Sequence, residues 1–160
     1  MTSAATDQRP LPAGAGEFWF LGTKMTMRAS GASTGGALGL IEQVAPAGFA
    51  APPHVHHGED EGFYVVAGSL TFHCGASVIA AGPGAFVWLP RDQPHWFEVD
   101  AAGPATLLQL NTPAGLERFF AEMGTPVQDS AIAPAGEPDI GRLVSLAASY
   151  QVELLPPTAH

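Results

Sequence analysis

The sequence has little cysteine and few basic residues. Among 160 residues there is one cysteine, Cys74, and 6 Lys or Arg stand against 15 Asp or Glu, which gives a formal net charge of −9. A lone cysteine forms no internal disulfide, so we expect a reducing, cytoplasmic compartment. A chain this acidic has no electrostatic footprint for nucleic acid or for an anionic membrane surface, so neither is expected as a partner.

The chain also lacks the patterns of secretion signals and membrane anchors. Residues 1–12 show no basic start followed by an apolar run, so no signal peptide is expected. The 29 residues of 62–90 contain no Asp, Glu, Lys or Arg. Glycines and a proline interrupt this stretch too often for a membrane helix. It is typical of several short strands in succession.

Charged residues make up only 13% of the chain, whereas Gly and Pro contribute 19 and 15 residues. This composition excludes a coiled coil and favours a compact, turn-rich, all-β domain. The length suits about one domain. Strand character is expected at 24–28, 37–44, 62–67, 69–74, 76–80, 85–89, 95–99 and 105–110, with Gly or Pro turns between most of these segments. Many short strands at close spacing predict a sandwich or barrel.

The last third of the chain changes to helical spacing. Apolar residues recur at that spacing after Pro113 until Gly124, and Asp139 can cap a second short helix. The sequence therefore predicts three parts: a flexible segment 1–16, a β-barrel 17–112 and a C-terminal helical extension 113–160 that packs on the barrel.

Three histidines and one glutamate form the most informative pattern. His54 and His56 stand two residues apart, so on a strand both imidazoles leave the same face. Glu61 begins the next apolar strand and can supply an oxygen, and His95 offers a third imidazole. This set predicts a site for one divalent transition metal ion, and it suits Fe, Mn, Co, Ni or Zn equally.

Neighbouring polar residues have simpler interpretations. His57 follows His56 directly and is expected on the opposite face as a surface residue. Glu59 shares strand parity with Glu61 and is a rival ligand, although Glu61 has the better spacing. Asp60 is read as a solvated loop charge, and His73 as a structural histidine with satisfied hydrogen bonds.

The spacing of these residues resembles the two motifs of the cupin superfamily. Gly48, five residues, His54-x-His56, Glu61 and Gly68 follow the first motif. The second motif is matched by the residues Gly84, Pro90 and His95. Two positions depart from it: Asp92 stands where the family has Gly, and Val99 where it often has Asn. Asp tolerates unusual backbone angles, and neither departure removes a metal ligand.

The resemblance implies a double-stranded β-helix, that is, a jelly-roll barrel. Beyond the motif spacing, several segments resemble the quercetin 2,3-dioxygenase-like group of small bacterial monocupins. These segments are 18–22, 34–36, 52–56, 112–116 with 119–120, and 147–157. The likeness implies a metal-dependent dioxygenase that acts on a small aromatic or enol substrate such as a flavonol, with dioxygen as co-substrate and Glu61 as both ligand and base. Homodimers are common among small cupins, so the likeness also implies a homodimer.

A barrel of this size holds one small ligand in its mouth. We expect a substrate pocket lined by Phe63, Phe86, Trp88, Phe97 and Leu110, although each of these side chains also suits an ordinary barrel core. Two other functions stay open. One is a cyclase or isomerase in which the metal acts as a Lewis acid on polyketide-type substrates. The other is a small-molecule-binding protein without catalysis.

Overall fold

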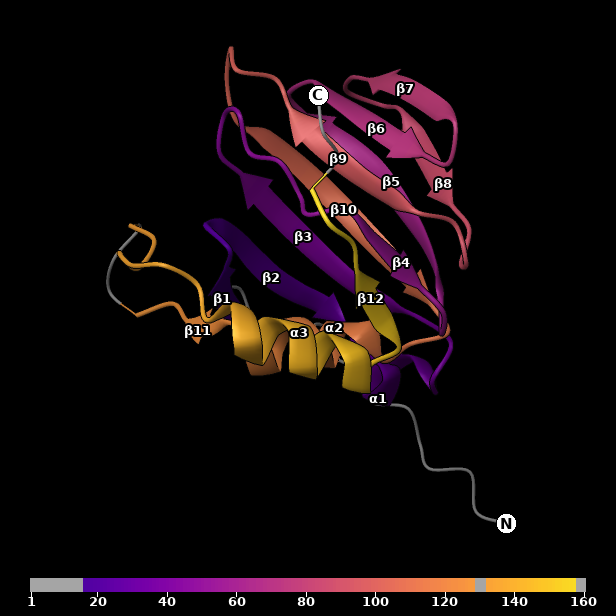
Figure 1. The fold of residues 1–160 in the computed structure, drawn as a ribbon, viewed down its shortest axis with the longest axis vertical. Helices are drawn as coiled ribbons and strands as arrows, with labels where there is room; N and C mark the ends of the chain where they lie inside the picture. Colours follow the sequence, from indigo (N-terminus) through magenta and orange to yellow (C-terminus); the bar gives the residue numbers. More distant parts are fainter. Residues whose placement is uncertain (1–15, 129–131, 158–160) are drawn as a thin grey trace.

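A computed structural model describes residues 16–128 and 132–157, so the predicted flexible segment lies outside the described residues except for Gly16. The described chain forms two antiparallel sheets that face each other, with helices across one end (Figure 1). This arrangement confirms the predicted all-β jelly roll.

The larger sheet has seven strands in the order β11-β1-β2-β3-β10-β5-β8. Their bounds are β11 (Thr125–Pro126), β1 (Glu17–Phe20), β2 (Thr23–Ala29), β3 (Gly39–Ala45), β10 (Ala105–Thr112), β5 (Asp60–Ala67) and β8 (Phe86–Leu89). The smaller sheet has five strands in the order β12-β4-β9-β6-β7. Their bounds are β12 (Val152–Leu154), β4 (His54–His56), β9 (His95–Val99), β6 (Leu70–Cys74) and β7 (Ser77–Ala81).

Strict alternation along the strands separates an inner from an outer face. In β10, Leu107, Gln109 and Asn111 are buried, whereas the residues between them are partly exposed. In β9, the buried residues are His95, Phe97 and Val99, as the sequence pattern predicts. The inner faces of the two sheets pack together into one hydrophobic core, so polar side chains on these faces are enclosed between the sheets.

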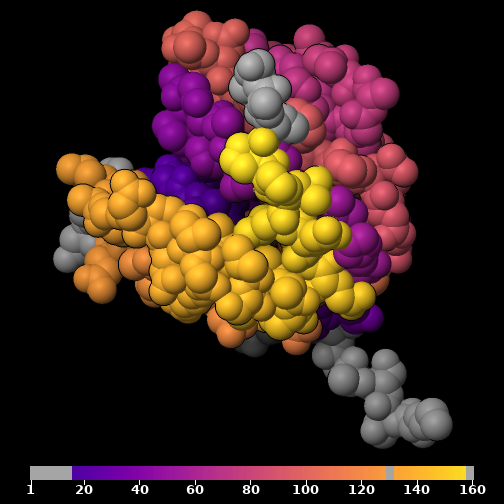
Figure 2. Space-filling view, viewed as in Figure 1, coloured from indigo at the N-terminus to yellow at the C-terminus, as the bar shows by residue number. Residues whose placement is uncertain are grey.

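A second hydrophobic core joins the C-terminal helices to the barrel. Helices α2 (Leu116–Met123) and α3 (Ile140–Ser149) lie across one end of the sheets, and β12 follows α3 into the smaller sheet (Figure 1). Figure 2 shows the α3–β12 segment crossing the front of the strands. Phe20 of β1 contacts Phe119 and Phe120 of α2 in edge-on geometry, with ring centroids 5.6 and 5.0 Å apart.

Both predicted helices are present, with one shift and one addition. The second begins as predicted, because the Asp139 side chain accepts a hydrogen bond from the Arg142 N–H. The first begins at Leu116, after Gly115, rather than at Pro113. A short helix, α1 (Gly31–Thr34), was not predicted, because four residues are too few for a helical pattern. Within the described ranges, no helix is long and apolar enough to cross a membrane.

A buried carboxylate fastens α2 to the barrel. Glu117 is 1% exposed, and its two oxygens accept hydrogen bonds from the backbone N–H groups of Gly31 (2.8 Å) and Gly115 (2.7 Å). Gly39 makes room for this side chain, because a Cβ there would lie 2.4 Å from Glu117 Oε2. One carboxylate thus links the start of α2 to α1, and it packs against Gly39 at the start of β3.

We predict that Glu117→Gln destabilises the fold by about 1–3 kcal/mol, because the amide brings an N–H group against a backbone donor and leaves it without an acceptor. Chemical denaturation followed by circular dichroism measures this change. The matched control is Glu122→Gln on the exposed side of α2, which we expect to change stability by less than about 0.5 kcal/mol. Equal stability of the two variants would contradict the role given to Glu117.

Candidate metal centre

The four predicted ligands converge between the two sheets. His54 and His56 come from β4, His95 comes from the adjacent β9, and Glu61 comes from β5 of the facing sheet. His54 and His95 are directly paired across their strands. One nitrogen of each histidine and one oxygen of Glu61 all lie within 4.8 Å of one another. Strand parity therefore delivers both residues of the His-x-His pair to one site, as the sequence predicts.

Backbone carbonyls fix the ring orientation of two histidines. His54 Nδ1 donates to the carbonyl oxygen of Pro52 (2.6 Å), and His95 Nδ1 donates to that of Gln93 (3.1 Å). Since a carbonyl oxygen only accepts, each Nδ1 carries the proton. Nε2 of each ring therefore faces the cluster, and this is the nitrogen that a metal ion would bind.

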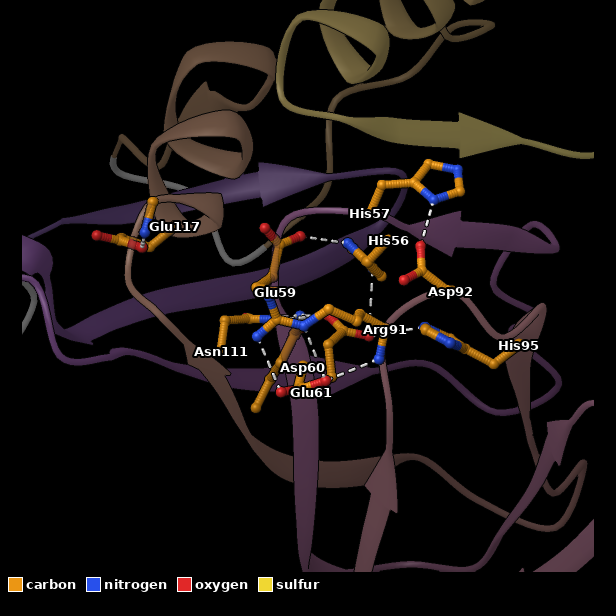
Figure 3. Close-up of polar contacts among 12 residues, drawn as sticks. His56, His57, Glu59, Asp60, Glu61, Arg91, Asp92, His95, Asn111 and Glu117 are labelled. Atoms are coloured by element: carbon orange, nitrogen blue, oxygen red, sulfur yellow. Dashed lines mark hydrogen bonds and ion pairs between the residues drawn. The ribbon is translucent and has the colours of Figure 1, made fainter.

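A buried carboxylate fixes the ring orientation of the third histidine, His56. Glu59 is 7% exposed, and its Oε1 accepts from His56 Nδ1 at 2.5 Å (Figure 3). His56 Nε2 is buried and makes no hydrogen bond, although it lies 3.3 Å from Glu61 Oε2. A buried polar atom without a partner is rare and destabilising. The rival ligand Glu59 thus contacts the outer nitrogen of His56 and leaves the inner one free for a metal ion.

The carboxylate of Glu61 is held from both sides. Its Oε1 accepts hydrogen bonds from Gln109 Nε2 (2.6 Å) and Asn111 Nδ2 (2.8 Å). Its Oε2 faces His95 Nε2 at 2.8 Å. Gln43 in turn donates to Gln109 Oε1. The amides therefore fix which oxygen points into the cluster, and that oxygen is Oε2.

These contacts fit a bound cation. His95 Nε2 and Glu61 Oε2 lie 2.8 Å apart, so either a proton shared between them or a divalent metal ion bound by both satisfies the two atoms. Three imidazole nitrogens and one carboxylate oxygen suit Fe, Mn, Co, Ni or Zn, as expected from the sequence.

Without a metal, the cluster divides its protons unequally. Burial and the neighbouring imidazoles of His56 and His95 lower the pKa of His54 to about 3. Burial opposes protonation of His56 as well, but Glu61 and Glu59 outweigh it and raise its pKa to about 10. Burial opposes ionisation of Glu61, yet His56 and His95 hold its pKa well below the usual range. The carboxylate therefore stays ionised at neutral pH.

An apolar cavity of about 80 Å³ adjoins the cluster. Of the predicted pocket residues, Phe63 and Phe97 line it, together with all four predicted ligands. Phe86, Trp88 and Leu110 do not. Phe86 and Trp88 are 59% and 46% exposed, and Leu110 lies on the partly exposed face of β10.

Strand alternation explains this difference. In β8 the inner face is occupied by Val87 and Leu89, so Phe86 and Trp88 point outward. An apolar strand with apolar residues on both faces gives no sequence signal of which side is inside.

The homodimer that the likeness implies stays a prediction.

The other polar residues near the motifs have structural contacts. His57 points to the surface and contacts Asp92, as Figure 3 shows, and also Glu153 of β12. Asp60 is not a free loop charge, because both of its oxygens bind Arg91. Asp92 adopts a positive φ of 63°, which agrees with its place at a position where the family has glycine.

His73 has the satisfied contacts expected of a structural histidine. It stacks on Trp96 with the ring centroids 4.4 Å apart, and it hydrogen-bonds Glu98.

Sequence reasoning missed the amides Gln43, Gln109 and Asn111 and the inward role of Glu59. One signal was present: Gln109 continues the inner-facing parity of Leu107 in β10, and a polar residue on a buried face needs a partner. Its partner could not be identified from the sequence, because it depends on which strand pairs with β10.

Residues 40–111 match the family described as "Cupin domain", and this segment contains all four predicted ligands. A comparison with the sequences of curated proteins finds no match. The match covers 72 of the 160 residues, and together with the fold it supports a likeness to the cupin superfamily.

Solved structures show the same fold at low sequence identity. KdgF from Halomonas sp. is 17% identical with a TM-score of 0.58, over 66% of this chain and 93% of that one. The W96Y oxalate decarboxylase of Bacillus subtilis is 17% identical with a TM-score of 0.54, over 61% of this chain and 27% of its own. A structure titled for the DMSP lyases RdDddP and RnDddQII is 24% identical with a TM-score of 0.50, over 59% of this chain and 49% of that one.

We predict that the protein binds one Zn²⁺ or Co²⁺ per chain and that His95→Ala lowers this affinity by more than about 100-fold, because it removes a ligand from the centre of the cluster. Equilibrium dialysis with elemental analysis measures the binding. The matched control is His73→Ala, which removes a histidine outside the cluster and should keep full binding. Full metal content in His95→Ala would contradict the ligand assignment.

Glu59→Gln tests the orientation of His56. Because the amide accepts from His56 Nδ1 without a negative charge, we expect metal affinity to fall by about 10- to 100-fold while the fold is kept. Competition with a zinc chelator of known affinity measures the change. Glu98→Gln is the control, since it alters a glutamate–histidine contact away from the cluster. A Glu59→Gln variant with unchanged affinity would show that Glu59 does not position the ligand.

Proposed function

We propose that this protein is a metal-dependent enzyme, a dioxygenase that acts on a small aromatic or enol-bearing molecule. One observation carries the proposal: four convergent ligand groups line an apolar cavity together with Phe63 and Phe97. Perturbed titratable groups beside a cavity are typical of active sites.

A redox-active divalent metal held by His54, His56, Glu61 and His95 would supply the site at which substrate and dioxygen are activated. The chain's own residues have separate roles. Glu61 Oε2 faces the cluster and is the group to which we assign the removal of a proton from the substrate. Gln109 and Asn111 keep Oε1 turned away, and the apolar walls exclude water.

A second function without redox chemistry is also supported. Two of the structural neighbours are an oxalate decarboxylase and DMSP lyases rather than oxygenases. The same four side chains suit a metal that acts as a Lewis acid, as in a cyclase, isomerase or lyase. Both functions require the metal, and they differ in whether dioxygen is consumed.

Oxygen uptake separates these functions. Protein reconstituted in turn with Fe²⁺, Mn²⁺, Co²⁺, Ni²⁺ or Zn²⁺ is offered catechols, flavonols and β-diketone enols, with dissolved oxygen and products both measured. We expect one mole of oxygen consumed per mole of product, with both oxygen atoms in the product. Glu61→Gln should lower the turnover of metal-loaded protein by about 100-fold or more, because it removes the base.

Turnover without oxygen uptake would replace the dioxygenase by the Lewis-acid function. Saturable binding with no product under any metal would favour a non-catalytic binding protein. Unchanged turnover of a metal-loaded Glu61→Gln variant would exclude the base role.

A further inference from the structure

The lining of the cavity beside the metal centre has a polar and an apolar part. The polar part includes the four ligand side chains with Gln43 and Gln109. The apolar part comes from two clusters: Phe49, Phe63 and Phe97 belong to the barrel core, whereas Phe20, Phe119, Phe120, Leu143, Val152 and Leu154 belong to the second core. Among the described residues that line the cavity, no Lys or Arg is present, and Glu61 is the sole acid.

We propose, building on the proposed function, that this cavity takes a compact amphipathic molecule with a single oxygen-bearing head and an apolar body of about one ring. The head lies against the metal ligands, and the body lies against the part of the lining that residues of β1, α2, α3 and β12 contribute. Leu154 is the residue of this wall that we assign to substrate specificity.

The charge of the lining excludes a second polar group on the substrate. A second carboxylate, placed against the apolar lining, would have no cationic side chain to pair with. It would also lose its hydration among aromatic and aliphatic groups. This distinguishes the proposed ligand from a dicarboxylate, whose second group needs a charged or polar partner.

The volume limits the size of the body. A cavity of about 80 Å³ compares with roughly 10–15 Å³ for one enclosed water, so it holds on the order of six waters. One ring or a chain of a few carbons fills that space. A three-ring flavonol is too large to be enclosed with the wall in this position.

The position of β12 explains why its side chains decide the fit. Val152 and Leu154 are paired with His56 and His54, so β12 runs directly beside the strand that carries two ligands. Leu154 lines the cavity and is half-buried, which makes it easier to replace than the more deeply buried Phe119. A larger side chain at 154 fills space next to His54 without altering any ligand.

The experiment measures the binding of simple carboxylates to Co²⁺-loaded protein under nitrogen. Acetate, propanoate, butanoate, benzoate, succinate and quercetin are the probes, read by the visible spectrum of the bound cobalt and by calorimetry. We expect the dissociation constant to fall about threefold to fourfold per added methylene from acetate to butanoate. Succinate, which has the length of butanoate but a second carboxylate, should bind at least about tenfold more weakly than butanoate.

Leu154→Phe tests the wall. We expect benzoate to bind at least about tenfold more weakly to this variant and acetate to bind as in the wild type, since the head site is unchanged. Leu154→Ala should weaken butanoate binding about fivefold. This variant replaces Leu154→Phe in the test if the larger side chain perturbs the fold. The control is Val144→Phe, an exposed position on α3 that does not line the cavity.

The inference is overturned if affinity does not depend on chain length, if succinate binds as well as butanoate, or if quercetin binds as tightly as benzoate. Leu154→Phe with unchanged benzoate binding overturns the role of that residue. Each of these results leaves the oxygenase proposal standing, because no turnover is measured. Failure to bind cobalt instead overturns the metal centre and the proposed function. Calorimetry of the metal-free protein with the same carboxylates then still tests whether the apolar lining binds the body of the probe.

Discussion

The structure depends on the close approach of His95 Nε2 and Glu61 Oε2 across the space between the two sheets. At 2.8 Å the two atoms are joined by a hydrogen bond, and a metal ion bound by both would take its place. Their strands belong to different sheets, so this contact ties one sheet to the other. A metal ion that binds the folded chain alone would raise its stability, so metal binding would be coupled to folding.

The surrounding contacts keep this arrangement from relaxing. An imidazole that could rotate would turn its lone pair away, and a carboxylate that could rotate would exchange its two oxygens. Glu59 prevents the first at His56, and Gln109 and Asn111 prevent the second at Glu61. Because these partners are buried, their hydrogen bonds are not exchanged for water. The ligand atoms are thus preorganised before any ion enters.

The features that could be predicted from the sequence are those that depend only on neighbouring residues. The shared face of His54 and His56 needs only strand parity, and the cap at Asp139 needs only three residues of helix. The contact between Gln109 and Glu61 needs the pairing of β10 with β5, which no local pattern contains. The outward direction of Phe86 could not be predicted for a related reason. Its strand is apolar on both faces, so parity separates the two faces but does not show which of them points to the core.

The candidate metal ligands and part of the cavity wall come from different parts of the chain. All four ligands lie within residues 40–111, the segment that matches the cupin family, whereas Phe20, Phe119 and Leu154 lie outside it. Under the proposed binding mode, a shared ligand set carries little information about the substrate, because part of the surface that would contact the substrate's body comes from other segments. A chain with the same fold and the same four ligand residues, but with different residues in α2, α3 and β12, would then accept a different molecule.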